Sequence, residues 1–462
     1  MAAVLDGTET QSPDERVLTL ADPGTAVVRE RHEGALWATA NLRGVPSVVF
    51  ALDHRVQAGA MHESNCAIIV AAYRHALQQA RPIVGLWHSA GARLQDGIRA
   101  LHAVAQVFRA MTEASGRIPQ ISVVLGPAAG GAAYGPGLTD VVIMAPSGRV
   151  FITGPAIIKE VTGEEIDVES LGGPASHGEE SGVAHIVAES EPDAYHKAAT
   201  VVELFGAPGK TEPAQVSDRT FSGLLPDRVR RAYDIHPVVA RLLDAPPVEL
   251  QAGWARSVVT SLGRLGGGTV GVVASNPLRR GGCLDSRSAE KAARFVRMCD
   301  SFGIPLVVLV DVPGYLPGVA EEWGGVVRRG AKLLHAFAEA TVPRVTVVLR
   351  KAYGGAYIAM SCRGLGADRV LAWPQAEIAV MGAMAAVRLL HRHELAAAAD
   401  RERPRLEAYL IGQHLAEAGG LPAAVEAGVV DQIIEPDSTR AAVAEALAAL
   451  PARRGEHGNI PL

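Results

Sequence analysis

The chain contains little cysteine, and its cysteines form no cluster. Only four occur among the 462 residues, and no C-x-x-C pair is present: Cys66, Cys283, Cys299 and Cys362. A disulfide framework or a zinc ribbon requires paired or clustered cysteines. We therefore expect four buried thiols and no metal in this chain. The same pattern suits a reducing compartment and predicts a cytoplasmic location.

Long apolar runs and an excess of positive charge are missing as well. No window of about 18 uninterrupted apolar residues occurs, so no segment has the length of a membrane-spanning helix. The first residues, MAAVLDGTETQSPDERV, lack the signal-peptide order of basic residues before an apolar core. The formal net charge is −5, whereas nucleic-acid binders carry a basic balance. We expect neither a membrane nor a nucleic acid as partner.

Several catalytic signatures are also absent. The sequence contains no H-E-x-x-H, G-x-S-x-G or G-x-x-x-x-G-K-[ST] motif. These absences argue against zinc peptidases, α/β-hydrolases and P-loop nucleotidases, because each chemistry requires those side chains at that spacing. His391 and His393 are neighbours in sequence, but their i, i+2 spacing separates the two rings on a helix. An exposed helix is therefore expected there, not a metal site.

Glycine, in contrast, is abundant and often occurs in short runs. The chain has 49 glycines, while its 48% apolar and 20% charged residues are ordinary for a soluble globular protein. Glycine lets the backbone approach a ligand closely. We therefore expect backbone amides, more than side chains, to line an important site. The length of the chain is sufficient for two or three domains with full hydrophobic cores.

The two halves of the chain repeat one another. Apolar strands, loop glycines and strand-opening prolines recur in the same order in both halves. The equivalent landmarks keep offsets of 223, 224 and then 228 residues: Gly59 and Gly282, Pro82 and Pro305, Gly91 and Gly314, Pro119 and Pro343, Gly130 and Gly354, Asp140 and Asp368, Gly154 and Gly382. Two unrelated βα units would not keep such spacings, so the repeat predicts two homologous domains.

The alternation of strands and helices predicts the fold class. Short Val/Ile/Leu runs alternate with helical patterns such as Cys66–Gln79 and Ala289–Phe302. Continuous apolar strands followed by helices are typical of largely parallel sheets that are covered on both faces. We therefore predict an α/β protein with domains at 1–225 and 226–462. Residues 206–231, rich in Pro, Gly and charge, are the predicted linker.

A glycine pair follows a buried strand at the same place in each half. The sequences are A-A-G-G-A-A-Y-G around Gly130 and K-A-Y-G-G-A-Y-I around Gly354, and each leads into the start of a small-residue helix. A helix start leaves amide N–H groups unpaired and carries partial positive charge. Two such groups aimed at one point form an oxyanion hole. Close helix–strand packing is the alternative explanation, but the recurrence in both halves favours two oxyanion holes.

Long motifs in both halves point to one family. They are H-S-A-G-A-R-L-Q-D-G (His88–Gly97), G-P-A-A-G-G-A-A-Y-G-P (Gly126–Pro136), F-I-T-G-P…K-E-V-T-G-E-E (Phe151–Glu165), N-P-L-R-R-G-G (Asn276–Gly282), D-V-P-G-Y-L-P-G (Asp311–Gly318), R-R-G-A-K (Arg328–Lys332), K-A-Y-G-G-A-Y (Lys351–Tyr357) and I-A-V-M-G-A (Ile378–Ala383). With them the chain resembles, from about Leu36 to its end, the β-type carboxyltransferase subunits of acetyl-CoA and propionyl-CoA carboxylases. This resemblance implies two homologous crotonase-like (ββα-superhelix) domains in tandem.

The resemblance also implies roles for individual residues. Gly130 and Gly131 would stabilise the thioester enolate of an acyl-CoA, and Gly355 and Ala356 would receive the ureido oxygen of biotin. Further residues on the acyl-CoA side would be Gly59, Ala60, Met61, Ser89, Ala90, Gly91, Ala92, Arg93 and Tyr134. Further residues on the biotin side would be Gly314, Gly354, Tyr357 and Ile358.

The implied reaction moves the carboxylate of carboxybiotin to the α-carbon of acetyl-CoA or propionyl-CoA, which gives malonyl-CoA or methylmalonyl-CoA. Biotin itself would be the base in this reaction, so no side-chain acid–base pair is required. The missing catalytic signatures agree with this interpretation. The apolar Ile358 stands where the family tunes its choice of acyl chain, and it implies tolerance of both acyl groups.

Four residues depart from the family pattern. Ala58 and Ala90 stand where glycine is common, His62 stands where glycine is frequent, and Glu321 replaces a usual glutamine. Three of the four belong to the presumed CoA loops. They could change the shape of a loop, the affinity for CoA or the acyl group that is accepted.

The chain lacks two other parts of a complete carboxylase. No ATP-grasp region is visible, and none of the six lysines lies in the biotin-attachment sequence A-M-K-M. The resemblance therefore implies a separate α subunit, with biotin carboxylase and biotin carboxyl carrier functions. It also implies a homo-oligomer, a dimer at least and typically a hexamer, in which the first half of one subunit faces the second half of another.

Two alternatives remain open from the sequence. A biotin-linked decarboxylase would run the same half-reaction backwards on malonyl-CoA or methylmalonyl-CoA. A non-catalytic paralogue would only scaffold the complex, although the intact glycine pairs argue against it. An enoyl-CoA hydratase is less compatible, because that chemistry needs positioned carboxylates in one domain.

Overall fold

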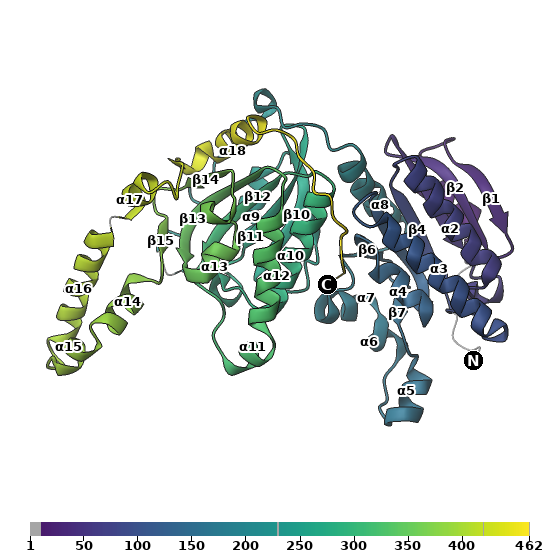
Figure 1. Ribbon diagram of the computed structural model, residues 1–462, viewed down its shortest axis with the longest axis horizontal. Coiled ribbons are helices and arrows are strands. Elements are labelled where there is room, and N and C mark those ends of the chain that lie inside the picture. Colours follow the sequence, from purple (N-terminus) through teal and green to yellow (C-terminus); the bar gives the residue numbers. More distant parts are fainter. Residues whose placement is uncertain (1–10, 229–230, 419, 462) are drawn as a thin grey trace. The chain divides into compact units, whose positions relative to one another are not determined.

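The computed structural model describes residues 11–228, 231–418 and 420–461 and divides into two compact units (Figure 1). The first unit comprises Met1–Pro208 with Gln251–Trp254 and Glu456–Pro461, and the second comprises Gly209–Leu250 with Ala255–Gly455. The predicted domain boundary at 225/226 lies in the segment between α8 and α9, in which a short 3-10 turn spans Pro213–Gln215. That exact boundary remains a prediction.

The first unit contains β-β-α layers that begin with a three-stranded meander. Its elements are α1 (Pro13–Leu20), β1 (Val27–His32), β2 (Ala35–Leu42), β3 (Val45–Leu52), η1 (Gln57–Gly59), α2 (Glu63–Gln78), β4 (Ile83–Ser89), η2 (Leu94–Asp96), α3 (Ile98–Ala114), β5 (Gln120–Ala129), α4 (Gly131–Gly137), β6 (Val141–Met144), β7 (Arg149–Phe151), α5 (Pro155–Thr162), α6 (Val168–Gly172), α7 (Pro174–Ser176), a π-helical turn (His177–Ser181), β8 (Ile186–Val187) and α8 (Glu191–Gly206).

The second unit repeats this order and adds helices near its end. Its elements are α9 (His236–Leu242), β9 (Val248–Leu250), β10 (Val258–Leu265), β11 (Gly268–Ser275), η5 (Arg280–Gly282), α10 (Ser286–Ser301), β12 (Leu306–Val312), α11 (Val319–Trp323), α12 (Val326–Glu339), β13 (Arg344–Tyr353), α13 (Gly354–Ala359), η6 (Arg363–Leu365), β14 (Arg369–Ala372), β15 (Glu377–Ala379), α14 (Ala383–Leu390), α15 (Arg392–Ala397), α16 (Arg403–Ala418), α17 (Gly420–Glu426), β16 (Gln432–Ile433), η7 (Pro436–Ser438) and α18 (Thr439–Ala448).

The two units contain sheets of the same topology. The strand order is β1-β2-β3-β4-β5-β6-β8 in the first, with β7 paired to β5. In the second it is β9-β10-β11-β12-β13-β14-β16, with β15 paired to β13. The first three strands of each sheet pair antiparallel, and the later pairs are parallel. The predicted repeat and the largely parallel α/β fold are therefore confirmed.

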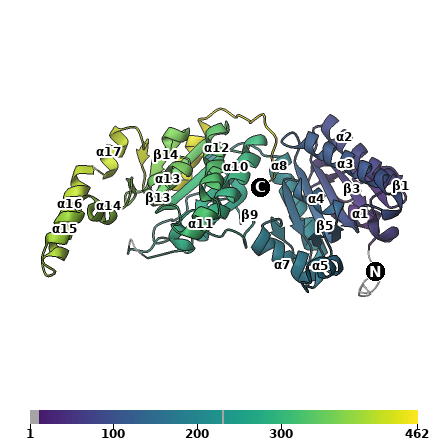
Figure 2. The ribbon, with the colours of Figure 1, turned by 60° about the horizontal axis from the view of Figure 1, so that its bottom comes forward.

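Helices cover both faces of each sheet, as the continuous apolar strands predict. In the first unit α2 packs against β2 and β3 and pairs with α3, while α1 and α8 contact each other and reach β3, β5 and β6. In the second unit α10 pairs with α12, and α9 and α18 share a core cluster with the strands (Figures 1 and 2). The helices α14 to α16 extend away from this sheet beyond β14 and β15. The parallel strands end on one edge of each sheet, where the loops that carry the predicted site begin.

Within the described ranges, no helix is both long and apolar enough to cross a membrane.

A histidine between two carboxylates links α9 to β9 in the second unit. The His236 ring lies 2.5 Å from Asp234 and 3.0 Å from Glu249. The hydrogen bond with Glu249 is the main cause that raises the pKa of His236 to about 9. A histidine with a raised folded pKa stabilises the fold fully below its unfolded pKa of about 6.5. This contribution is lost as the pH rises through about 9.

We therefore expect His236→Gln to lower the urea midpoint of unfolding most near pH 6. The deficit should narrow steadily between about pH 6.5 and pH 9, because over that range the unfolded ring has lost its proton while the folded ring still holds it. The ring is 44% exposed, so solvent screening keeps the effect small. A deficit that does not change with pH would contradict this electrostatic account.

Candidate functional site

Two loops of the first unit that carry predicted acyl-CoA residues lie side by side. Met61 forms an isolated parallel bridge with Ala92. The Met61 N–H donates to the Gly91 carbonyl at 2.8 Å, and the Arg93 N–H donates to the Met61 carbonyl at 2.9 Å. The Ala90 N–H donates to the Ala58 carbonyl at 2.9 Å. The structure therefore brings the loop around Gly59–Met61 together with the loop at Ser89–Arg93.

Glycine is required where these loops meet the strand ends. A Cβ on Gly59 (φ +68°) would lie 2.0 Å from the His88 carbonyl oxygen. A Cβ on Gly91 (φ +99°) would lie 2.5 Å from the carbonyl oxygen of Ala129, the last residue of β5. No other residue type allows this approach without displacing the backbone. The two glycines thus hold both loops against the point where α4 begins.

The glycine pair of the first unit starts α4. Gly130 is the N-cap, with φ 58° and ψ −127°, and its N–H donates to the Phe151 carbonyl at 3.0 Å. The Gly130 amide is thus used within the fold. The next two amides, those of Gly131 and Ala132, lie in the first turn, where a helix offers them no acceptor. The start of α4 therefore presents amide donors beside the two loops.

A buried tryptophan fixes α4 in place. The Trp87 ring fills the space that a Cβ on Gly135 would enter, at 2.3 Å, and its Nε1 donates to the Ser122 Oγ at 2.8 Å. On the other side Val104 of α3 comes within 3.4 Å of a Cβ position on Gly131. The helix start is therefore held by packing on both sides, which is the preorganisation that an oxyanion site requires.

The remaining predicted acyl-CoA residues surround this point with different exposure. Ser89 is fully buried, and its Oγ accepts the Gly91 N–H at 3.1 Å. Ala90 is exposed, whereas Ala60 and Ala92 are half-buried. Tyr134 lies on α4 with half of its surface exposed, edge-on to Phe108 at 6.2 Å between ring centroids. All of the residues predicted for the acyl-CoA side thus belong to the loops or to α4.

The second unit repeats this backbone arrangement. Leu284 bridges to Tyr315, and the Leu284 N–H donates to the Gly314 carbonyl at 3.1 Å. The Leu316 N–H donates to the Leu284 carbonyl at 2.7 Å. A Cβ on Gly282 (φ +84°) would lie 2.5 Å from the Asp311 carbonyl oxygen. These contacts are the counterparts, 223 residues later, of those at Met61, Gly91 and Gly59.

The predicted biotin residues gather at the start of α13. Gly354 adopts φ +57°, and a Cβ there would lie 2.9 Å from the Val380 carbonyl oxygen. A Cβ on Gly355 would meet nothing within 4 Å, so the space on that side of the residue is open. The parallel pairing of Val312 with Ala352 brings Gly314 to the same edge of the sheet.

Two side chains of α13 differ in exposure. Tyr357 is 7% exposed, and its buried hydroxyl has no hydrogen-bond partner within the part of the chain that the structure describes. Burial raises the pKa of Tyr357, so the hydroxyl keeps its proton at neutral pH. Ile358 is 46% exposed. A neutral hydroxyl without a partner among the described residues therefore belongs to the same short helix as Gly355.

The two units brace this edge with different side chains. In the second unit Asp311 and Arg350 form a buried ion pair at 3.0 Å, and Asp311 also accepts the Lys351 N–H at 3.1 Å. In the first unit the equivalent of Asp311 is His88, whose Nδ1 lies 3.3 Å from an Arg16 nitrogen. Burial lowers the pKa of His88 to about 3, so its ring is neutral. Sequence reasoning missed these braces, although the repeat offset aligns His88 with Asp311.

The repeat also aligns the amides. At the offset of 224 residues Gly131 corresponds to Gly355, and Ala132 corresponds to Ala356. The pair predicted for the first unit was Gly130 with Gly131. Which two amides bind a ligand remains a prediction, but the bond from Gly130 to Phe151 shows that the Gly130 amide is already engaged.

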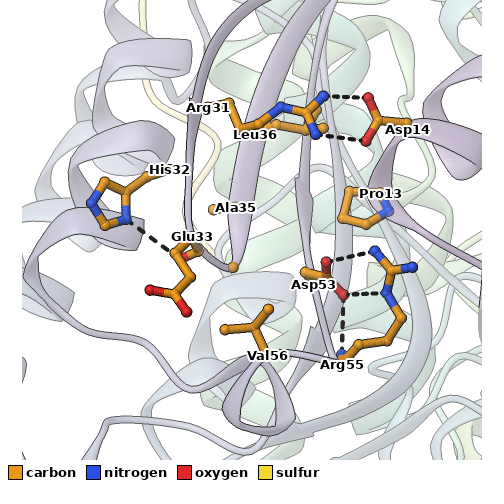
Figure 3. A pocket seen from close by; sticks show the side chains of 11 residues that line it. Pro13, Asp14, Arg31, His32, Glu33, Ala35, Leu36, Asp53, Arg55 and Val56 are labelled. Atoms are coloured by element: carbon orange, nitrogen blue, oxygen red, sulfur yellow. Dashed lines mark hydrogen bonds and ion pairs between the residues drawn. The ribbon is translucent and has the colours of Figure 1, made fainter.

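A cavity of about 450 Å³ lies near the acyl-CoA loops, and none of the predicted site residues lines it (Figure 3). Its lining includes the turn between β1 and β2 and the segment from Asp53 to Val56. Arg31 pairs with Asp14, and Arg55 donates to both oxygens of Asp53. The bond from Arg55 holds the pKa of Asp53 below its usual value. The arginines of the cavity are therefore already neutralised.

Among residues 11–228, 231–418 and 420–461, no group of three or more His, Cys, Asp or Glu side chains could hold a metal ion.

Two of the departures noted in the sequence have visible consequences. Ala58 adopts φ 53° and ψ 31°, the left-handed conformation that its counterpart Gly281 adopts with φ 63° and ψ 15°. Glu321 accepts hydrogen bonds from Arg280 at 3.1 Å and from the Ser286 hydroxyl at 3.0 Å. Glu321 thus ties η5 and the start of α10 to α11.

We expect Ala58→Gly to stabilise the protein. A left-handed alanine costs about 1 kcal/mol, which glycine avoids at the expense of some unfolded-state entropy. The reverse change in the other unit, Gly281→Ala, should destabilise the protein by a similar amount. A Cβ at Gly281 would meet no neighbour, so the substitution adds backbone strain alone. Thermal melts of the two variants measure both effects. Shifts of the same sign would contradict the assignment of strain to Ala58.

Comparison with known proteins supports one family. Residues 38–458 match the carboxyl transferase domain. The biotin-dependent acetyl-/propionyl-coenzyme A carboxylase beta6 subunit of Mycobacterium tuberculosis is 57% identical over the whole chain and 98% of its own length. The propionyl-CoA carboxylase beta chain of Rhodococcus erythropolis is 54% identical over 98% of the chain and 97% of its own length.

A solved structure agrees along almost the whole chain. The transcarboxylase 12S structure, described as a hexamer assembly with methylmalonyl-coenzyme A bound, superposes with a TM-score of 0.89 and 38% identity. The match covers 98% of this chain and 92% of that one. The tandem units, the duplicated glycine loops and these matches lead to one conclusion. The chain belongs to the carboxyl transferase family and is a carboxyltransferase, related along its whole length to the β subunits of acyl-CoA carboxylases.

Proposed function

We propose that this chain transfers the carboxylate of carboxybiotin, carried by a partner subunit, to the α-carbon of acetyl-CoA or propionyl-CoA. The main support is the duplicated backbone arrangement: each unit presents the first amides of a helix beside two loops bridged to each other. A transfer between two ligands needs two sites that stabilise negative charge. One unit for each ligand would meet that need without a side-chain acid or base.

On the acyl-CoA side, the first amides of α4 would bind the thioester oxygen. An enolate carries more negative charge on that oxygen than the thioester does, so a fixed amide there favours the enolate. Gly131, next to Val104, is the first of these donors. Gly91 and Met61 would form the wall along which the CoA chain enters, because their loops adjoin the start of α4.

On the biotin side, the residues present suit a ureido group. The open backbone at Gly355 and the unsatisfied hydroxyl of Tyr357 offer hydrogen-bond donors to an acceptor oxygen. Bound biotin would supply the carboxyl group and, after its departure, the base for the α-proton. Gly355 and Ala356 would hold the ureido oxygen, and the glycines at 314 and 354 would permit close approach of the ring.

Two relatives support a proposal about the partner subunit and the oligomeric state. The mycobacterial relative is a subunit of a biotin-dependent carboxylase, and the transcarboxylase 12S structure is a hexamer assembly. We propose that this chain likewise works with a separate α subunit that carries biotin, and that it forms a homo-oligomer, a dimer at least and a hexamer in its full form. The cytoplasmic location remains a prediction from the sequence.

The reverse half-reaction tests this proposal without a partner protein. The purified chain is mixed with malonyl-CoA or methylmalonyl-CoA and biocytin, and the formation of acetyl-CoA or propionyl-CoA is followed. We expect turnover that depends on biocytin. Gly131→Pro and Gly355→Pro remove one amide donor each at helix positions that tolerate proline, so each should lower kcat about 10²- to 10³-fold while the fold persists.

The control is Val168→Pro, which removes the amide of the first residue of α6 outside both glycine sites and should leave kcat unchanged. Decarboxylation without biocytin would favour a plain decarboxylase. Absence of turnover with both thioesters would favour a non-catalytic scaffold. Equal losses of kcat in Gly131→Pro, Gly355→Pro and Val168→Pro would argue against a catalytic role of the Gly131 and Gly355 amides.

A further inference from the structure

The short strand β7 carries the hydrogen bond that places the start of α4. It pairs in parallel with the end of β5, where Phe151 lies opposite Ala129. The Phe151 carbonyl accepts the Gly130 N–H at 3.0 Å. Gly131, whose amide is proposed to bind the thioester oxygen, directly follows Gly130 in the chain. A displacement of β7 would therefore move this amide donor.

A histidine holds the opposite edge of β7. Successive carbonyls of a strand point to opposite edges, so the Val150 carbonyl faces away from β5. The His177 Nε2 lies 2.6 Å from this carbonyl oxygen, and the ring donates because a carbonyl only accepts. Gly172 of α6, which contacts β7, packs on the same oxygen, where a Cβ would lie 2.4 Å away. His177 thus supplies the hydrogen bond that a further strand would supply at this edge.

The second ring nitrogen of His177 is used as well. Its Nδ1 lies 2.7 Å from the Ser181 Oγ. In the neutral ring with its proton on Nε2, Nδ1 accepts the hydroxyl proton of Ser181. The Val183 N–H donates to the same hydroxyl oxygen at 3.4 Å. Rotation of the ring would break both of its bonds, so His177 has one favoured orientation.

The turn that carries His177 is itself held in place. Residues His177–Ser181 form a π-helical turn, a feature that often occurs at functional sites. The next residue, Gly182, adopts φ +74°, and a Cβ there would lie 2.5 Å from the Trp254 ring. The Gln251 Nε2 donates to the Gly182 carbonyl at 2.6 Å. The turn is therefore a fixed support for β7.

The second unit supports its equivalent strand in another way. There β15 pairs with the end of β13, with Ala379 opposite Tyr353. The Tyr353 hydroxyl donates to the Glu377 carboxylate, and in the described part of the chain α14 follows β15 in place of a histidine turn. The histidine support thus belongs to the unit assigned to acyl-CoA, where the enolate oxygen needs a fixed donor.

We propose that His177 is a positioning residue for the carboxyl transfer, which acts through β7 on the Gly131 amide. This inference rests on the proposed function. The amide must stay at one point while negative charge develops on the thioester oxygen, and a displaced β7 would weaken that stabilisation. The loops assigned to CoA are held by their own bridge between Met61 and Ala92. Loss of His177 should therefore lower kcat much more than it weakens acyl-CoA binding.

Two conservative substitutions separate the roles of the two ring nitrogens. His177→Gln places an amide N–H near the Nε2 position, whereas His177→Asn reaches only the Nδ1 position. The reverse half-reaction with methylmalonyl-CoA and biocytin gives kcat and KM, and calorimetry gives the affinity for propionyl-CoA. We expect His177→Asn to lower kcat about tenfold, as for the loss of one hydrogen bond, with KM and affinity within about twofold of wild type. His177→Gln should keep kcat within about threefold of wild type.

A double-variant cycle tests the route through Gly131. If His177 acts on this amide, His177→Asn should cost nothing further in protein that already contains Gly131→Pro. The matched control is His185→Gln. The His185 Nδ1 accepts the Val142 N–H at 3.1 Å, so this variant removes a histidine bond to strand β6. It should lower the melting temperature and leave kcat unchanged.

The outcomes separate this inference from the proposed function. An unchanged kcat in His177→Asn, an equal loss in His177→Gln or His185→Gln, or additive losses in the double variant would overturn the inference alone. If His177→Asn does not fold, Ser181→Ala gives the test, because it frees the ring on one side only. Its kcat should then fall about threefold at unchanged KM, and an unchanged kcat would overturn the inference. Absence of biocytin-dependent turnover in wild-type protein would overturn the proposed function, and the inference with it.

Discussion

The arrangement of the site depends on a backbone contact that only glycine permits. At Gly59 the loop after β3 approaches the carbonyl oxygen of His88 so closely that a Cβ would lie 2.0 Å from it, and Gly282 approaches Asp311 in the same way. These contacts hold each loop against the end of the next strand. The bridges of Met61 to Ala92 and of Leu284 to Tyr315 then follow. Because each bridged pair of loops borders the start of a helix, a ligand can meet several backbone donors in a fixed arrangement.

The same backbone plan is supported differently in the two units. A buried Asp311–Arg350 ion pair braces the second unit, whereas the first has a neutral His88 beside Arg16. Breaking a buried ion pair is costly, so Asp311 and Arg350 must be kept together. The helix after the loop differs as well, with a capping Asp285 in one unit and an uncapped His62 in the other. The backbone is thus duplicated, and the side chains around it have diverged as expected for two sites with different ligands.

Much of this could be predicted from the sequence, and the rest could not for physical reasons. The nearly constant offsets of the landmark glycines predicted the repeat, and alternating apolar runs predicted α2, α10 and the parallel strands. The resemblance predicts the oxyanion pair of the first unit at Gly130 and Gly131. The hydrogen bond from Gly130 to Phe151, which engages the first of these amides, depends on the pairing of β5 with β7, and no sequence pattern predicts that pairing. The Asp311–Arg350 brace and the His32–His62 contact likewise join residues distant in sequence. The sequence shows that His62 departs from the family pattern, but it does not show that the His32 ring lies beside it.

The central claim is that one backbone device, present twice, serves acyl-CoA in the first unit and biotin in the second. The matched variants Gly59→Ala and Gly282→Ala test it most directly, because each places a methyl group against the strand-end carbonyl of one unit only. The measurement is the affinity for propionyl-CoA and the KM for biocytin in the reverse half-reaction. We expect Gly59→Ala to weaken propionyl-CoA binding at least about tenfold with little change in the biocytin KM. We expect Gly282→Ala to raise the biocytin KM at least about tenfold with little change in propionyl-CoA binding. Equal effects of both variants on both ligands, or the reverse assignment, would contradict it.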